Sequence, residues 1–175
     1  MQIERIAETR LTATDDRAIG QLLDHAFGID FQGRSYFQNR HHVRFIVRDG
    51  ASIIGHIALS LRAIRMGDTL VQVAGLAEVA TARARRGKGI ASALLQAAIG
   101  EAKESVAEFL VLFGDAPLYA GAGFTTKPNR IRTVAMREVR TGQQEDKQDS
   151  NLMVMQLKDT CWDDDAHIDL VGFAF

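Results

Sequence analysis

The sequence lacks several features that define large classes of proteins. Cysteine occurs once among the 175 residues, at Cys161, which excludes an internal disulfide framework and a cysteine zinc cluster. No apolar run is long enough to cross a bilayer, and the N-terminus lacks the basic region and apolar stretch of a signal peptide. We therefore expect a cytoplasmic protein that has no membrane partner.

Neither sign of charge is in large excess, because the formal net charge is −1. The cations gather in one cluster without interleaved aromatic residues, so we expect no nucleic-acid partner. The five histidines are scattered, and His41 and His42 have no histidine partner at the spacing of a helical metal face. We therefore expect no metal.

Three further motifs are missing. There is no Walker loop and no serine in a nucleophile elbow. A dinucleotide fingerprint is incomplete, because Ser92 stands where the third glycine after Gly87 and Gly89 is required. Cys161 has no neighbouring histidine pattern typical of a nucleophilic cysteine, so we expect no role for it in catalysis.

Acidic residues are also missing from one stretch, between Thr81 and Gly100. Within it, Arg83–Ala91 carries four cations and two glycines where a strand-like run becomes a helix-like one. Such a loop can turn several backbone N–H groups toward one point, where the helix dipole also favours negative charge. This pattern indicates a ligand that bears phosphate, and the alternative is a solvated basic turn.

The remaining pattern predicts one α+β domain over residues 1–175, with a mixed, mostly antiparallel sheet of about seven strands flanked by helices. Asp-Gly at 49–50 indicates a hairpin, and a first helix is expected to begin at Thr14 and end before Gly28. The polar residues 141–150 are expected to form an exposed loop, and residues 158–175 a C-terminal tail. The other expected elements are a helix from Ile90 to about Ser105, a buried strand at Glu108–Phe113 and a short helix at Pro117–Gly121.

This order of elements, with Arg86-x-x-Gly89-x-Ala91 between a strand and a helix, resembles the GNAT superfamily of acyl-CoA N-acyltransferases. The signature of that family is Arg/Gln-x-x-Gly-x-Gly/Ala. In this sequence, the specific motifs of the family lie only within Val79–Phe124. Two positions depart from the commonest pattern: Ala91 replaces the final glycine, which the signature permits, and Arg83 stands where proline is frequent.

The resemblance implies acetyl-CoA as co-substrate. The amides of the signature loop would bind its pyrophosphate, and the preceding strand would pair with its pantetheine arm. The residues implied to bind it are Val79, Ala80, Thr81, Arg86, Gly87, Lys88, Gly89, Ile90 and Ala91.

Tyr119 is the candidate acid. Tyr119-x-x-x-Gly123-Phe124 matches the family segment whose tyrosine protonates the departing thiolate of coenzyme A. A phenol suits this task, because its pKa is close to that of a thiol. The alternative is a packing tyrosine whose hydroxyl bonds to a backbone carbonyl.

Glu78 is the candidate base, because many relatives place their base on the strand before the signature. In simple alternation Glu78 shares a face with Gln72 and Ala74, and a bulge could reverse that phase. A surface or ion-paired glutamate is an equal alternative. For His56, on the preceding strand, a structural role is favoured.

The function expected from these residues is acetyl transfer from acetyl-CoA to a primary amine by direct attack. The acidic tail at Trp162–Asp165 resembles distantly the aminoglycoside 2′-N-acetyltransferases, which suggests a cationic acceptor, or else is a solvated loop. A local resemblance of Gly33–Ser35 and His56–Leu59 to nodulation N-acyltransferases suggests a longer acyl-CoA or an acyl carrier protein as an alternative donor. A sensor that binds acyl-CoA without turnover is a further alternative. The partner expected is a small-molecule amine, with homodimer formation left open.

Overall fold

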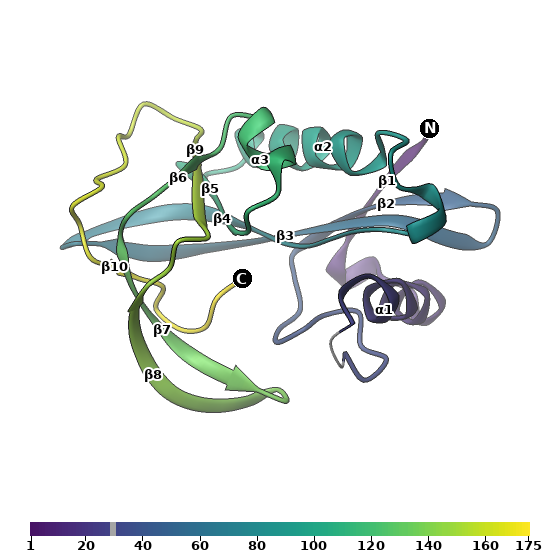
Figure 1. The fold of residues 1–175 in the computed structure, drawn as a ribbon, viewed down its shortest axis with the longest axis horizontal. Coiled ribbons are helices and arrows are strands. Elements are labelled where there is room, and N and C mark those ends of the chain that lie inside the picture. Colours follow the sequence, from purple (N-terminus) through teal and green to yellow (C-terminus); the bar gives the residue numbers. More distant parts are fainter. Residues whose placement is uncertain (29–30) are drawn as a thin grey trace. The chain divides into compact units, whose positions relative to one another are not determined.

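A computed structural model describes residues 1–28 and 31–175, and Figure 1 shows the order of its elements. The helices are α1 (Ala13–Phe27), α2 (Ile90–Glu104) and α3 (Pro117–Gly121), with 3-10 helices η1 (Glu8–Arg10) and η2 (Arg83–Arg85). The strands are β1 (Ile3–Ala7), β2 (Val43–Asp49), β3 (Ser52–Met66), β4 (Thr69–Thr81), β5 (Phe109–Phe113), β6 (Thr125–Thr126), β7 (Arg130–Arg137), β8 (Arg140–Gln148), β9 (Leu152–Gln156) and β10 (Ile168–Asp169).

The predicted α+β class with a mixed, mostly antiparallel sheet is confirmed, although the described residues form ten strands rather than about seven. The chain divides into two compact units. Unit 1 comprises Met1–Ser60 and Ala77–Gly100, and unit 2 comprises Leu61–Leu76 and Glu101–Phe175. Strands β3 and β4 and helix α2 each contribute residues to both units. A single domain over the whole chain stays a prediction.

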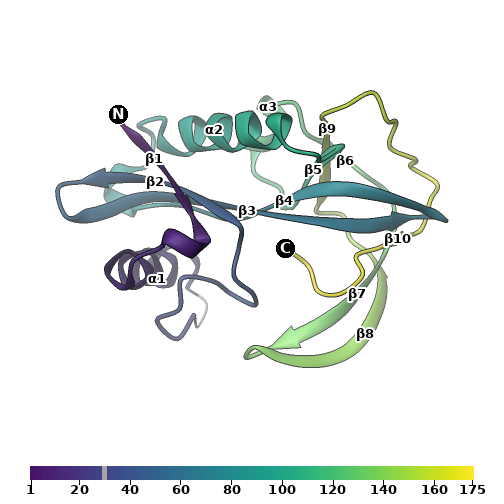
Figure 2. The ribbon, with the colours of Figure 1, turned by 180° about the vertical axis from the view of Figure 1, so that it is seen from behind.

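Unit 1 is built on the predicted hairpin. Strand β2 pairs antiparallel with β1 on one side and with β3 on the other, and Gly50 takes a φ of 60° in the turn between β2 and β3. Figures 1 and 2 show α1 and α2 on opposite faces of this hairpin. The face toward α1 is apolar around Ile19, Leu23 and Ile46, all fully buried. Burial of these side chains fixes the hairpin against α1.

Helix α1 begins at Ala13, one residue earlier than predicted, and its N-cap lies two residues before Thr14. The side chain of Thr12, not Thr14, accepts the backbone N–H of Asp15 at 3.1 Å. Thr14 lies inside the helix. Gly28 ends the helix at a left-handed φ of 60°, which glycine adopts without steric cost and which confirms the predicted stop.

A glycine also allows α2 to approach β3 closely. A Cβ atom built on Gly55 would lie 2.5 Å from Ile90 Cγ2 and 2.9 Å from Leu94 Cδ1. These distances are too short for any larger residue, so Gly55 sets the depth at which the first turn of α2 packs. The loop that precedes Ile90 is thereby held against the strand.

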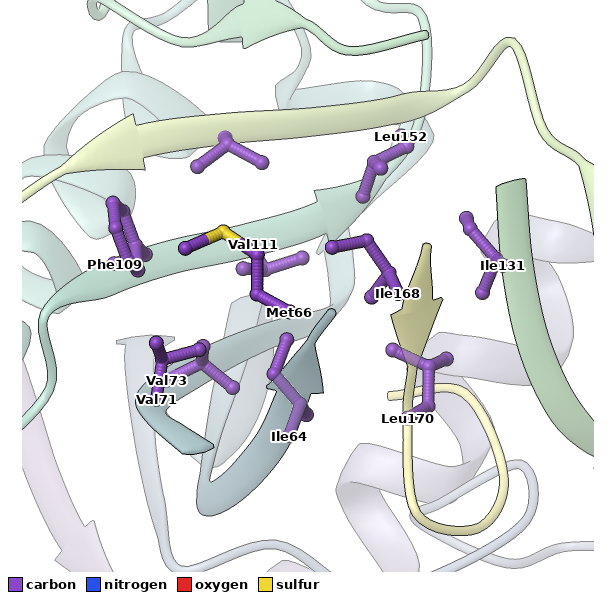
Figure 3. Packing of buried hydrophobic residues seen from close by; sticks show 11 residues of the cluster. Ile64, Met66, Val71, Val73, Phe109, Val111, Ile131, Leu152, Ile168 and Leu170 are labelled. Atoms are coloured by element: carbon purple, nitrogen blue, oxygen red, sulfur yellow. The ribbon is translucent and has the colours of Figure 1, made fainter. Parts of the chain in front are cut away.

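Unit 2 has its own apolar core, shown in Figure 3. Strand β5 pairs parallel with β4 and antiparallel with β9, and its side chains from Phe109 to Leu112 are at most 2% exposed. The Trp162 ring packs edge-on against Phe109, with the ring centroids 5.1 Å apart, and its indole N–H donates to the Asn129 side chain. This aromatic contact fixes residues 158–166 of the tail on the core.

One expectation for the C-terminal part was wrong. The residues expected to form an exposed loop, 141–150, lie mostly in β8, which pairs antiparallel with β7 although nearly all its side chains are exposed. The tail contains β10, which pairs with β3 and β7. Backbone hydrogen bonds alone can hold such a polar strand in a sheet, so the side-chain pattern gave no sign of it.

Candidate active site

The predicted signature loop joins η2 to α2 and carries two glycines in the left-handed region. Gly87 and Gly89 each have a φ of 75°, and no atom lies within 4 Å of a Cβ built on either. The carbonyl of Gly89 accepts the N–H of Ala93 and thereby begins the α2 ladder. The first amides of this 15-residue helix have no acceptor within the helix itself.

Three of the four basic side chains around this loop are exposed and available to bind a ligand. Arg83, Arg86 and Lys88 are exposed, and the first turn of α2 holds no acidic residue. Arg85 is partly occupied, because it forms an ion pair with Asp49 of the β2–β3 turn. The predicted cluster of four cations is thus three available cations and one that fixes the loop to the hairpin.

The strand segment before the loop, Val79–Thr81, leaves one buried polar atom without a partner. The Thr81 Oγ1 atom has no hydrogen bond among the described residues. The backbone carbonyl of Thr81 accepts a long hydrogen bond from Arg86 Nε at 3.4 Å. Ala82 N–H donates to Ile54 O, which ties the end of β4 to β3. A buried hydroxyl without a partner is costly, so Thr81 is a position where a ligand with a polar group would be stabilised.

A hollow of about 420 Å³ lies beside the start of the loop. Its lining comes from α1, from the β2–β3 turn and from η2, and includes Gln21, His25, Ser52, Ala82 and Arg83. Arg83, at the start of η2, is the one cation among the described residues that line this hollow.

Glu78 has a φ of 54°, a value rare for a residue other than glycine and found here within a strand. Its side chain is 8% exposed, and its carboxylate accepts hydrogen bonds from Phe37 N–H at 2.6 Å and from His41 Nε2 at 2.9 Å. In a regular strand Glu78 would share a face with Gln72. The positive φ at Glu78 interrupts this alternation, as a bulge would do. A left-handed residue of this kind costs about 1–3 kcal/mol and persists only where its surroundings hold it.

The surroundings of Glu78 form a buried polar cluster that the sequence analysis did not find. Arg44 is fully buried and makes two hydrogen bonds to the Glu8 carboxylate, at 2.7 and 3.0 Å. It also donates to Ser35 O at 2.6 Å and lies 3.9 Å from Glu78 Oε2. The one local sign of this cluster in the sequence is that the charged Arg44 lies between the apolar Val43 and Phe45.

The Glu8 carboxylate neutralises the buried Arg44. Burial opposes ionisation of Glu8, but hydrogen bonds from Arg44 and Arg40 outweigh it and lower the pKa of the Glu8 carboxyl below 4.5. A lowered carboxyl pKa contributes stability that is present above the unfolded value and lost as the pH falls through the folded value.

Replacing Glu8 by glutamine is expected to lower the free energy of unfolding at pH 7 by about 2–4 kcal/mol, because the Arg44 charge then remains buried without its counter-ion. The loss should shrink as the pH falls below 4.5 toward the lowered folded pKa, because the unfolded wild-type chain then takes up a proton that folded Glu8 does not. Urea unfolding at several pH values measures this. Glu104→Gln, at an exposed position, is the control. Equal losses at pH 3 and pH 7 would contradict the assignment.

Tyr119 lies in unit 2, in the single turn α3 that follows β5. Phe124 N–H donates to Tyr119 O at 3.1 Å, a reversal that Gly123 permits with a φ of 102°. This bond explains the spacing of the Tyr-x-x-x-Gly-Phe segment, since a left-handed residue is needed directly before the phenylalanine. The Tyr119 ring packs against Gly114, where a Cβ would lie 3.0 Å from it.

The phenol of Tyr119 is more than half buried, and no described residue forms a hydrogen bond with its hydroxyl. Burial, together with the negative charge of Asp115, raises the pKa of Tyr119 above 10.0. The phenol is therefore protonated at neutral pH, as a proton donor must be. The catalytic role of Tyr119 and the alternative of a packing tyrosine both stay predictions.

Of the other residues singled out from the sequence, His56 belongs to the polar cluster around Glu78, with its Nδ1 2.8 Å from Glu78 O. In the acidic tail, Asp164 forms an ion pair with Lys127 at 2.8 Å, and Asp163 accepts the N–H of Asp165. Cys161 is exposed. Among the described residues, no group of three or more His, Cys, Asp or Glu side chains could hold a metal ion, and no helix has the length and apolar character of a membrane span.

Comparison with known proteins identifies the class of this chain. The family model described as an acetyltransferase (GNAT) domain matches residues 9–126. Because this match covers more than half of the sequence, the chain belongs to the GNAT acetyltransferases and is an acyl-CoA-dependent transferase. The predicted family is thereby confirmed. No curated protein matches the sequence.

Solved structures agree on the fold. A GNAT family N-acetyltransferase of Escherichia coli in complex with CoA is 19% identical with a TM-score of 0.66, and the match covers 96% of this chain and 88% of that chain. A GNAT family acetyltransferase of Brucella melitensis in complex with acetyl-CoA is 16% identical with a TM-score of 0.62, covering 95% and 94%. The ribosomal-protein-S18-alanine N-acetyltransferase of E. coli is 16% identical with a TM-score of 0.61, covering 91% and 97%.

Proposed function

We propose that this protein transfers an acetyl group from acetyl-CoA to a primary amine. The observation that carries the proposal is the Arg86–Ala91 loop, which places two left-handed glycines with open space around them and exposed cations at the N-terminus of a helix, in a chain of the GNAT family. Similar folds hold CoA and acetyl-CoA in the E. coli and B. melitensis structures. The buried Thr81 hydroxyl, which has no hydrogen-bond partner among the described residues, can bond to the peptide-like pantetheine arm.

The loop residues have separate tasks in this proposal. The amides of Gly87, Gly89 and the following residues bind the pyrophosphate, with Arg86 and Lys88 adding charge-assisted hydrogen bonds. Val79–Thr81 pairs with the pantetheine arm. The bound thioester supplies an activated acyl carbonyl, and a backbone N–H of this strand segment stabilises negative charge on its oxygen.

Transfer then requires three proton movements. Glu78 accepts a proton from the ammonium group, directly or through water, and later releases it to solvent, so that the neutral amine can attack the carbonyl carbon. The new carbon–nitrogen bond forms as the carbon–sulfur bond breaks, and Tyr119 protonates the departing thiolate. The attacking nitrogen then loses its second proton, which returns through water to the Tyr119 oxygen. No covalent intermediate on the protein is needed. Cytoplasmic location and dimer formation stay predictions.

A screen for released thiol with acetyl-CoA and a panel of primary amines tests this proposal, followed by mass spectrometry of each product. The donor is then varied between acetyl-CoA, longer acyl-CoA and an acyl carrier protein. Turnover with a longer or carrier-bound donor alone would contradict acetyl transfer. A melting temperature raised by acetyl-CoA without thiol release from any amine would indicate a sensor instead.

Replacing Glu78 by glutamine is expected to lower kcat by about 100-fold near pH 7, where a primary amine is protonated and a base is needed. The deficit should narrow as the pH approaches about 10, because the amine is then neutral without help. Steady-state rates from pH 6.5 to pH 10 measure this. A deficit that is constant over this range would assign Glu78 a structural role only.

A further inference from the structure

The left-handed conformation of Glu78 has a specific support for its backbone. His56 Nδ1 lies 2.8 Å from Glu78 O, and Arg44 Nη1 lies 3.1 Å from His56 Nε2. Burial lowers the pKa of His56 well below its usual value, and the Arg44 charge lowers it further, so the ring is neutral. Since Arg44 can only donate, His56 must carry its proton on Nδ1 and donate it to the Glu78 carbonyl.

The carboxylate of Glu78 has a second support, from a different histidine. His41 Nε2 lies 2.9 Å from Glu78 Oε2, and Ser60 Oγ lies 3.1 Å from His41 Nδ1. The His41 side chain is only 2% exposed. A carboxylate can only accept, so Nε2–H donates to Glu78, and Nδ1 and the Ser60 hydroxyl share the other hydrogen bond.

We propose that His41 is a positioning residue that holds the Glu78 carboxylate in the orientation needed to accept the proton of the amine. The inference depends on the proposed function, in which Glu78 is the base. His56 fixes where the residue lies, and His41 fixes where its carboxylate points. His41 itself takes no proton from substrate, because both its ring nitrogens are engaged with Glu78 and Ser60.

The physical reason is the freedom of a glutamate side chain. Phe37 N–H reaches only Oε1, so without the His41 contact the carboxylate keeps this one hydrogen bond and the longer ion pair with Arg44 at 3.9 Å, and it can rotate away from the Phe37 amide. Displacement of a catalytic group by about 1 Å can cost about 100-fold in rate. The effect of losing His41 should therefore appear in kcat and leave the binding of acetyl-CoA unaffected.

Two amide variants of His41 separate the two ring nitrogens. In His41→Gln the side-chain amide reaches the place of Nε2 and can still donate to Glu78. In His41→Asn the amide reaches only the place of Nδ1, so it keeps the Ser60 contact and loses Glu78. Both substitutions are polar and smaller than histidine. His42→Gln, at the adjacent exposed position, is the matched control.

We expect His41→Asn to lower kcat by about 100-fold, with the KM for acetyl-CoA within about twofold of wild type. His41→Gln should retain kcat within about fivefold, and His42→Gln should match the wild type. If Gln and Asn lower kcat equally, the imidazole does more than orient Glu78. If Asn retains the wild-type kcat, His41 does not position the base. Either result overturns the proposal.

Hydrogen exchange of the Phe37 amide gives a readout that needs no substrate, because this amide donates to Glu78 Oε1. It should be protected in the wild type and in His41→Gln, and should exchange at least about tenfold faster in His41→Asn. This pattern in a protein that acetylates no amine would sink the proposed function and keep the positioning of Glu78. Equal protection in all three proteins would overturn the positioning itself.

Discussion

Replacing Gly89 by valine is expected to abolish the binding of acetyl-CoA. Gly89 has a φ of 75°, which a β-branched residue adopts only at a cost of about 1–3 kcal/mol. A valine that relaxes to a negative φ rotates the adjacent amides away from their common direction. A valine that stays would place two methyl groups in the open space where phosphate must approach. Either outcome removes the proposed phosphate-binding site.

Titration calorimetry with acetyl-CoA measures this effect, and the Kd should rise by more than about 100-fold. Gly100→Ala is the matched control, since Gly100 lies in the same helix without a positive φ and with nothing within 4 Å of its Cβ. Alanine is the better helix former by about 1 kcal/mol, so this variant should bind normally and melt no lower than the wild type. An affinity of Gly89→Val within a few-fold of wild type would contradict the assigned phosphate site.

The elements predicted correctly are those whose evidence is local. Helix α2 has its apolar residues at helical spacing, and the β2–β3 hairpin is marked by Asp49-Gly50. Strand β8 was missed because its side chains are exposed on both faces, so its sequence has no alternation to detect. The strand exists through backbone bonds to β7, and pairing of this kind is invisible in the segment itself.

The features of the candidate site also divide into those that local sequence predicted and those that it could not. The signature loop was predicted because its glycines and arginines are contiguous, and the structure gives Gly87 and Gly89 the left-handed φ that the motif implies. The orientation of Glu78 could not be predicted, because one residue with a positive φ changes which face a strand presents. His41 and Arg44 were missed since they meet Glu78 only after β2, β3 and β4 are paired.

The features of the site that the sequence did not predict, the backbone conformation of Glu78 and the burial of Arg44, are therefore the ones that carry strain and buried charge. A glutamate in the left-handed region and a fully buried arginine both oppose local preference. Each is retained by partners from several segments, which is the pattern expected where function rather than stability selects a residue. The same reasoning favours Glu78 over a surface glutamate as the candidate base.

Replacing Tyr119 by phenylalanine should lower kcat by about 100- to 1000-fold while the affinity for acetyl-CoA stays within about twofold. The ring and its packing on Gly114 and Phe124 are retained, and only the proton that the thiolate needs is removed. Because the pKa of Tyr119 is raised by burial, the wild-type phenol stays protonated across the neutral range. The loss should therefore be the same from pH 6 to pH 9.

Tyr36→Phe is the control, because Tyr36 is the other tyrosine in the sequence and its ring packs under the Arg40 guanidinium. It should change kcat little. Donors with better leaving groups provide a sharper test: a thioester of an aromatic thiol departs without protonation, so Tyr119→Phe should recover most of its rate with that donor. If Tyr119→Phe is slowed equally with both thioesters, the phenol does not act on the leaving group, and unchanged turnover with acetyl-CoA would remove Tyr119 from the mechanism altogether.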